Sequence, residues 1–199
     1  MSRTVEFLFD VGSPAAYLAF KRLPAICEQL GATLDWRPML LGGVFQATGN
    51  QSPVNIPAKG SYLFTDLQRF ARRHGIEFRQ NPHFPINTLT LMRIATGLQM
   101  REPQRLVAFV GAVYRAIWVD QRNMNDGAVV ASVVREAGFD PEALLALASD
   151  PAVKEQLKAQ TQEAVARGVF GAPTFFVGDA MFFGQDRLDF VKEALEAQR

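Results

Sequence analysis

The segment FLFDVGSPAAYLA, residues 7–19, joins a short apolar run to residues typical of a helix start. The alternation of apolar side chains predicts a buried strand that ends at Asp10. Ser13 is a preferred helix N-cap, and Pro14 suits the first helical position because the N–H that proline lacks would have no partner there. A second strand is expected over residues 33–37. The N-terminal part therefore predicts a β-α-β unit, whose two strands lie parallel in the usual right-handed arrangement.

The C-terminal part predicts a hairpin followed by a helix. Residues 174–177 and 180–183 are apolar runs on either side of Gly178-Asp179, a pair typical of two-residue hairpin turns. Asp186 is then expected to cap a last helix. The apolar stripe of that helix consists of Leu188, Val191 and Leu195. Joined to the β-α-β unit, this part completes a four-stranded mixed sheet flanked by helices, so the predicted fold class is α/β.

Residues from about 42 to 168 show no strand alternation. Apolar residues recur there at helical spacing, and Asp-Pro pairs at 140–141 and 150–151 are typical helix starts. The Gly- and Pro-rich stretch 42–60 has no periodicity, so a long loop is expected. We therefore expect a sheet domain of residues 1–42 and 169–199 that carries a helical insertion of residues 43–168.

Composition and charge disfavour several classes of protein. The net charge is +1, from 21 Lys and Arg against 20 Asp and Glu, so neither nucleic acid nor an anionic membrane surface is expected as a partner. The longest apolar stretch, residues 107–119, is interrupted by Arg115, and the N-terminus does not resemble an export signal, so a cytoplasmic protein without a membrane span is expected. Cys27 is the only cysteine and only two histidines accompany it, so neither a disulfide nor a metal centre is predicted.

Three segments carry residues suited to chemistry. Ser13 lies where the free N–H groups and the dipole of a helix stabilise an anion, although taken alone it is an ordinary cap. Pro173 suits a cis bond that would leave the backbone of Ala172 free to pair with a peptide-like ligand, and a plain loop proline is the alternative. Gln185 and Asp186 have the groups to hold the carboxylate and ammonium of an amino acid, although Asp186 in isolation is again a cap.

Three segments together resemble a known family. They are FLFDVGSPAAYLA at 7–19, ATGNQSPVNIPAKGSYLFTDLQRFARRHGI at 47–76 and VFGAPTFFVGDAMFFGQDRL at 169–188. In this order they resemble the 2-hydroxychromene-2-carboxylate isomerases and the related kappa-class glutathione transferases, over nearly the full chain. The resemblance implies a DsbA-like thioredoxin fold with a helical insertion, glutathione as cofactor, a small aromatic substrate, and a homodimer active in aromatic catabolism.

The resemblance also implies the roles of individual residues around glutathione. The serine that matches Ser13 faces the sulfur and is catalytic, and the residue that matches Ala172, before a cis proline at Pro173, pairs with the cysteinyl backbone. The positions that match Asn50 and Lys59 lie near the glycine end or the active site. The γ-glutamyl end is held by the stretch that matches Phe183, Gly184, Gln185 and Asp186.

The substrate site is where this sequence departs from the family pattern. Phe45 and Phe84 stand where the naphthalene-pathway isomerases have a lysine and a tyrosine, whereas Asn55 matches an asparagine there. A phenylalanine in place of the lysine removes a charge partner for a substrate carboxylate. Asn87, within HFPINTLTLMR, and Trp118 resemble parts of the substrate cleft, but both also suit the core or a cap, and for Trp118 core packing is favoured.

The expected reaction is a glutathione-dependent isomerisation. It would interconvert a 2-hydroxychromene-2-carboxylate-like compound and its trans-o-hydroxybenzylidenepyruvate-like isomer through thiolate addition and elimination. A kappa-class-like glutathione transferase or peroxidase acting on another electrophile is the alternative.

Three functions of other classes compete with this interpretation. A serine hydrolase would need glycine two residues after the nucleophile, where Ala15 stands. A disulfide oxidoreductase would need a CxxC pair, and Cys27 stands alone inside the first predicted helix. A protein that keeps the fold without catalysis is the third alternative.

Overall fold

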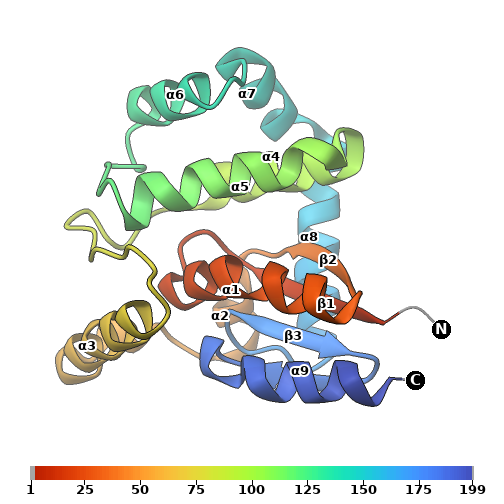
Figure 1. The fold of residues 1–199 in the computed structure, drawn as a ribbon. Helices are drawn as coiled ribbons and strands as arrows, with labels where there is room; N and C mark the ends of the chain where they lie inside the picture. The colour runs from red at the N-terminus through yellow and green to blue at the C-terminus, as the bar shows by residue number, and fades with distance from the viewer. Residues whose placement is uncertain (1–2, 199) are drawn as a thin grey trace.

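The computed structural model describes residues 3–198, which contain one four-stranded mixed sheet (Figure 1). The strands are β1 (Thr4–Phe9), β2 (Thr33–Pro38), β3 (Thr174–Val177) and β4 (Ala180–Phe183), in the spatial order β2-β1-β3-β4. β1 is parallel to β2 and antiparallel to β3, and β3 is antiparallel to β4. The predicted α/β class and mixed sheet are therefore confirmed, with the two ends of the chain meeting in the centre of the sheet.

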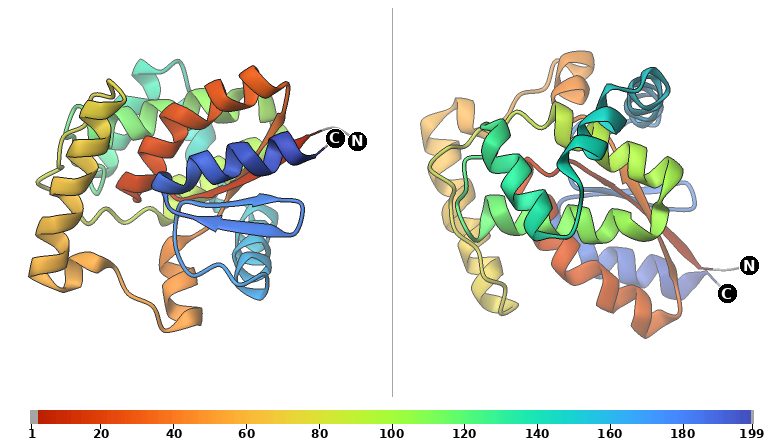
Figure 2. Two further views of the ribbon diagram at one scale, coloured as in Figure 1. Left: turned by 60° about the horizontal axis from the view of Figure 1, so that its bottom comes forward. Right: turned by 90° about the horizontal axis from the view of Figure 1, so that it is seen from above.

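Helices cover both faces of the sheet because the buried strand residues alternate between two cores. Phe7, Phe9 and Phe175 point to the face covered by α1 (Pro14–Leu30) and α9 (Leu188–Ala197), which lie side by side in Figure 2. Leu8 and Phe176 point the other way, into a smaller core. That core packs against α2 (Leu41–Thr48) and α8 (Pro151–Ala166). Each fully buried phenylalanine contributes about 1.5–3 kcal/mol to folding.

The remaining helices lie between the two halves of the sheet in sequence. They are α3 (Pro57–Arg73), α4 (Leu89–Arg101), α5 (Pro103–Trp118), α6 (Gly127–Glu136) and α7 (Pro141–Ser149). The expected Asp-Pro starts are present, since the side chains of Asp140 and Asp150 accept hydrogen bonds from Glu142 N and Ala152 N at 3.0 and 2.8 Å. The larger hydrophobic core runs without a break from the sheet into α4 and α5, so the division into two domains stays a prediction. No helix within residues 3–198 is both long and apolar enough to cross a lipid bilayer.

The long loop expected over residues 42–60 is wrong. Residues 42–60 are not a long loop, because they contain most of α2, the 3₁₀ turn η1 (Pro53–Asn55) and the start of α3. α2 buries only Val44 and includes two glycines, so it has no apolar stripe to detect, and packing against α8 holds it.

Asp186 does not cap the last helix. It lies in the 3₁₀ turn η2 (Gln185–Arg187), and α9 begins after Arg187 without a side-chain cap. The Asp186 carboxylate instead pairs with Arg187 at 2.6 Å. The predicted buried face of α9, with Leu188, Val191 and Leu195, is confirmed.

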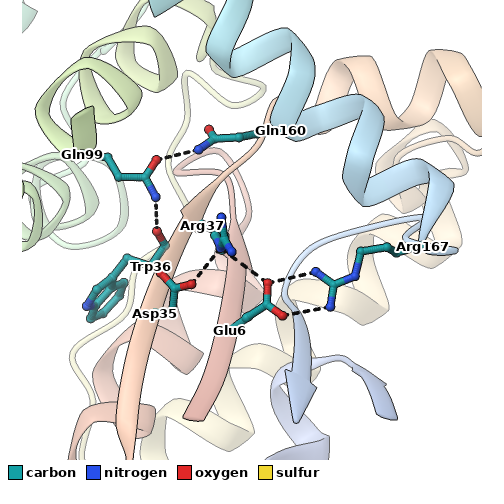
Figure 3. A network of polar contacts seen from close by, with 7 residues as sticks. All are labelled: Glu6, Asp35, Trp36, Arg37, Gln99, Gln160 and Arg167. Atoms are coloured by element: carbon teal, nitrogen blue, oxygen red, sulfur yellow. Dashed lines mark hydrogen bonds and ion pairs between the residues drawn. The ribbon is translucent and has the colours of Figure 1, made fainter. Parts of the chain in front are cut away.

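A polar network ties the edge of the sheet to α4 and α8 (Figure 3). Glu6 receives two hydrogen bonds from the Arg167 guanidinium, at 2.8 and 2.9 Å. Gln99 donates to the backbone carbonyl of Trp36 at 2.7 Å and accepts from Gln160 at 2.7 Å. These bonds satisfy polar groups along β1 and β2 that would otherwise be costly to cover with helices.

Glu6→Gln is expected to lower stability at neutral pH by about 1 kcal/mol, since the pair is partly solvent-screened. The hydrogen bonds from Arg167 hold the pKa of Glu6 below its ordinary value of 4.5, against the opposing effect of burial. The stabilisation is therefore full above pH 4.5 and is lost as the pH falls through the lower folded-state value. Urea unfolding of the wild type and of Glu6→Gln between pH 3 and 7 measures the difference in their free energies of unfolding, with the exposed Glu155→Gln as control. An equal difference at pH 3 and at pH 7 would contradict the prediction.

Candidate functional site

Ser13 is placed by the start of α1. It is nearly buried and has an extended backbone, and its Oγ accepts a hydrogen bond from Ala16 N at 3.1 Å, so the predicted N-cap is confirmed. The same hydroxyl donates to the backbone carbonyl of Ala172 at 3.0 Å. No acidic residue lies in the first turn of α1, so no side chain within that turn offsets the positive potential of the helix terminus. Ser13 thus combines a cap, a proton donor and a site suited to an anion.

Ala172 lies opposite Ser13, just before β3. The Ala172–Pro173 peptide bond is cis. The sequence predicted that the Ala172 carbonyl is free. This prediction is wrong, because the carbonyl accepts the hydrogen bond from Ser13. The Ala172 N–H has no acceptor within residues 3–198, and the residue is only half buried. One backbone donor is therefore available to a ligand at this position.

The turn after β4 forms a third side of the site. Gln185 is buried, and Arg22 from α1 donates to its backbone carbonyl at 2.9 Å and to its side-chain oxygen at 3.1 Å. Gly184 has a φ of 100°, a conformation that favours glycine, and its N–H donates to the carbonyl of Pro173. Burial lowers the pKa of Arg22. The turn is thus fixed to α1, while the Asp186 carboxylate stays partly exposed beside Arg187.

These segments enclose one cavity of about 410 Å³. Most of the residues singled out in the sequence line it: Ser13, Phe45, Asn50, Phe84, Ala172, Pro173, Phe183, Gly184, Gln185 and Asp186. Asn50 also donates to the carbonyl of Phe170 at 2.8 Å, which holds the α2–α3 connection against the segment before β3. The charged residues on the cavity wall are two carboxylates, Asp66 and Asp186.

Four of the residues singled out do not line this cavity. Lys59 lines a neighbouring cavity on α3 that shares Pro53, Leu63 and Asp66 with the first. Asn55 is exposed, and its amide donates to Gln51 at 3.2 Å.

The other two lie farther into the helical part. Asn87 lines a separate cavity of about 660 Å³ between α4, α6 and α7. Trp118 is fully buried, donates from Nε1 to the carbonyl of Val11 at 3.1 Å and packs against Phe84. Trp118 has the core position that the sequence favoured, and it supports the cavity wall from behind.

Several residues of the site were not predicted from the sequence. The Phe170 ring packs at a tilt against the Phe183 ring, with the ring centroids 4.5 Å apart. Gly171 leaves room for this pair, because a Cβ there would lie 2.8 Å from the Phe183 ring. Phe170 and Gly171 belong to the segment 169–188 that contains Pro173, so the sequence signal that could have identified them was that segment. Leu41 and Asp66 come from α2 and α3, and only the packing of those helices brings them to the cavity.

Comparison with known proteins identifies the family of this chain. The sequence model of the DSBA-like thioredoxin domain matches residues 4–196. The chain belongs to the DSBA-like thioredoxin family. Within this family it is 32% identical to a 2-hydroxychromene-2-carboxylate isomerase of Sphingobium xenophagum, over 98% of this chain and 99% of that protein. It is 29% identical to glutathione S-transferase kappa 1 of Homo sapiens, over 98% and 92% of the two chains.

A solved structure supports the same assignment. The structure of a 2-hydroxychromene-2-carboxylate isomerase superposes on this chain with a TM-score of 0.82 at 33% identity, covering 97% of this chain and 94% of that one. The family that the three sequence segments indicated is therefore confirmed, and so is the DsbA-like thioredoxin fold.

Proposed function

We propose that the protein is a glutathione-dependent isomerase of the 2-hydroxychromene-2-carboxylate isomerase type. The observation that carries the proposal is the meeting of Ser13, Ala172 and the Gln185–Asp186 turn on one cavity. Three distant segments thus present a proton donor at a helix N-terminus, a backbone N–H and a carboxylate to the same space. The relative at 32% identity is named a 2-hydroxychromene-2-carboxylate isomerase, and the relative at 29% identity is named a glutathione S-transferase, which supports the proposal.

The donor set of the cavity fits glutathione. The free N–H of Ala172 suits the cysteinyl backbone of a peptide lying along the start of β3, as an added strand would. The Asp186 carboxylate suits the γ-glutamyl ammonium, and the fixed Gln185 suits the polar groups beside it. These three residues would bind and orient the tripeptide.

Ser13 would act on the sulfur. Its hydroxyl and the N-terminus of α1 would stabilise a thiolate and lower the pKa of the bound thiol. Bound glutathione would supply the thiolate that adds to a conjugated carbon of the substrate, permits rotation about the former double bond and leaves again. The Ser13 proton would turn from the Ala172 carbonyl to the sulfur for this purpose.

One observation favours the kappa-class transferase as a second candidate. Phe45 and Phe84 make this part of the cavity wall apolar, and the charged residues on the whole wall are acidic. A substrate carboxylate would find no cation on this wall. An uncharged electrophile would meet no such difficulty, so conjugation of glutathione to it is the alternative reaction.

Thermal denaturation with millimolar glutathione tests the shared part of both proposals. A site for glutathione raises the melting temperature by mass action, whereas glycine, cysteine and glutamate added separately should not. Turnover of a 2-hydroxychromene-2-carboxylate without consumption of glutathione then supports the isomerase, and consumption with an aryl halide supports the transferase. No shift in melting temperature with glutathione or its conjugates would overturn both.

Arg22→Met is expected to weaken glutathione binding by about threefold to tenfold, because losing the two bonds to Gln185 loosens the turn that carries Asp186. Methionine keeps much of the buried apolar stem of the arginine. Calorimetric titration with glutathione measures the effect, with Lys21→Met on the exposed side of α1 as matched control. Equal affinities for the two variants would show that Arg22 does not organise the site.

A further inference from the structure

Asp10 is a buried carboxyl group that the proposed chemistry does not use. Its side chain accepts three hydrogen bonds: Oδ1 from Gly12 N at 2.8 Å, and Oδ2 from Leu41 N at 2.8 Å and from the Thr88 hydroxyl at 3.0 Å. Only 1% of the residue is exposed, and no ion pair to Asp10 occurs within residues 3–198. Burial raises the pKa of this carboxyl, and the hydrogen bonds from Gly12, Leu41 and Thr88 act against that effect.

The three donors belong to three segments that surround Ser13. Gly12 precedes Ser13 directly, and the backbone N–H of Ser13 donates to the Asp10 carbonyl at 3.0 Å. Leu41 begins α2, which brings Leu41 itself and Phe45 to the cavity. Thr88 immediately precedes α4, four residues after Phe84 on the cavity wall. One carboxyl group therefore joins the Ser13 loop to both neighbouring walls.

The spacing at Gly12 shows how closely these segments approach each other. A Cβ atom at Gly12 would lie 2.9 Å from Cγ2 of Thr88 and 3.3 Å from Oδ1 of Asp10. Glycine is therefore required for the Ser13 loop to lie against Thr88 above the carboxyl group. The loop and the start of α4 are in contact at the position where Asp10 bonds to both.

We propose that Asp10 is a positioning residue for Ser13, whose carboxyl group holds the Ser13 loop, the start of α2 and the start of α4 in one arrangement. The anchoring itself is independent of any ligand. Its consequence for the sulfur of glutathione rests on the proposed function. If the anchor is lost, Ser13 stays present but its hydroxyl no longer keeps a fixed direction toward the cavity, and small displacements of a reacting group lower rates strongly.

Asp10→Asn separates this role from simple packing. The amide has nearly the same shape, but only one of its two terminal atoms accepts hydrogen bonds. Whichever way it is turned, its NH₂ group faces the N–H of either Gly12 or Leu41, so one main-chain bond is broken. Thr88→Val removes only the hydroxyl and leaves both main-chain bonds, so its effect should be smaller. Thr65→Val removes a similar side-chain bond, to Ser61 O on the exposed side of α3, and serves as the unaffected control.

Amide hydrogen exchange tests the anchor without any ligand. In Asp10→Asn the amides of Gly12, Ser13 or Leu41 should exchange about tenfold faster than in the wild type, while the centre of the sheet exchanges as before. Unchanged exchange at all three amides would overturn the anchor. If this variant does not fold, Gly12→Ala applies the same test, because its Cβ forces the Ser13 loop away from Thr88.

Two further measurements test the effect on Ser13. With glutathione bound, Gly12→Ala, which leaves the Asp10 charge unchanged, should raise the thiol pKa toward that of free glutathione, and Asp10→Asn should lower kcat about tenfold with little change in KM. Faster exchange with an unaltered thiol pKa and kcat would overturn the positioning role and leave Asp10 a structural residue. If the wild type itself forms no bound thiolate, the proposed function fails, and the exchange experiment still upholds or overturns the anchor.

Discussion

Ser13→Ala is expected to leave the fold intact and to lower turnover about a hundredfold, as removal of one donor from a stabilised anion does. The variant loses the hydroxyl that caps α1 and bonds to Ala172, which costs about 1 kcal/mol of stability. Ultraviolet absorbance of the thiolate, followed against pH with glutathione bound, measures the effect on the sulfur directly. Ser149→Ala, whose hydroxyl bonds to its own helix α7, is the matched control.

Ser13→Asp distinguishes the chemical role of the serine from its role as a cap. Aspartate is as good an N-cap as serine, but when ionised it has no proton to donate and its charge repels a thiolate. If Ser13 acts on the sulfur, this variant should fold but be inactive, and it loses the bond to the Ala172 carbonyl as Ser13→Ala does. A Ser13→Asp variant with wild-type thiolate formation would reduce Ser13 to a cap.

Phe175→Ala is expected to cost about 3–5 kcal/mol of stability, because it opens a cavity in the centre of the sheet. Phe175 is fully buried on β3, and its ring stacks on Phe7 with centroids 5.3 Å apart. Guanidinium unfolding measures the loss. Phe190→Ala on α9 is the control, since that side chain is 52% exposed and should cost under about 1 kcal/mol. Similar losses for both variants would contradict the assignment of the core.

The sequence predicted the fold well where local signals and burial agree. The strands at both ends, the Ser13 cap and the Asp-Pro helix starts each have a short-range cause, and all are present in the structure. It failed at α2, whose eight residues have one buried side chain and depend on α8 for their packing. It failed also at Asp186, where the pairing with Arg187 replaces a cap.

The site was predictable to the extent that it consists of loops with distinctive residues. Ser13, Ala172 and Gln185 belong to such loops, and the structure brings them to one cavity. Lys59 and Asn87 were assigned through resemblance alone, and they lie on other cavities. Asp10 was seen only as the end of a strand, because its three partners are distant in sequence or donate from the backbone.

The hydrogen bond from Ser13 to Ala172 joins residues separated by 159 positions. Closing so long a segment costs conformational entropy, and chains with many contacts of this range fold more slowly. During synthesis the N-terminal strand and helix leave the ribosome well before the residues that complete the cavity. A nascent chain therefore has its serine exposed without the rest of the cavity around it, and the cavity is complete only once β3 has paired with β1.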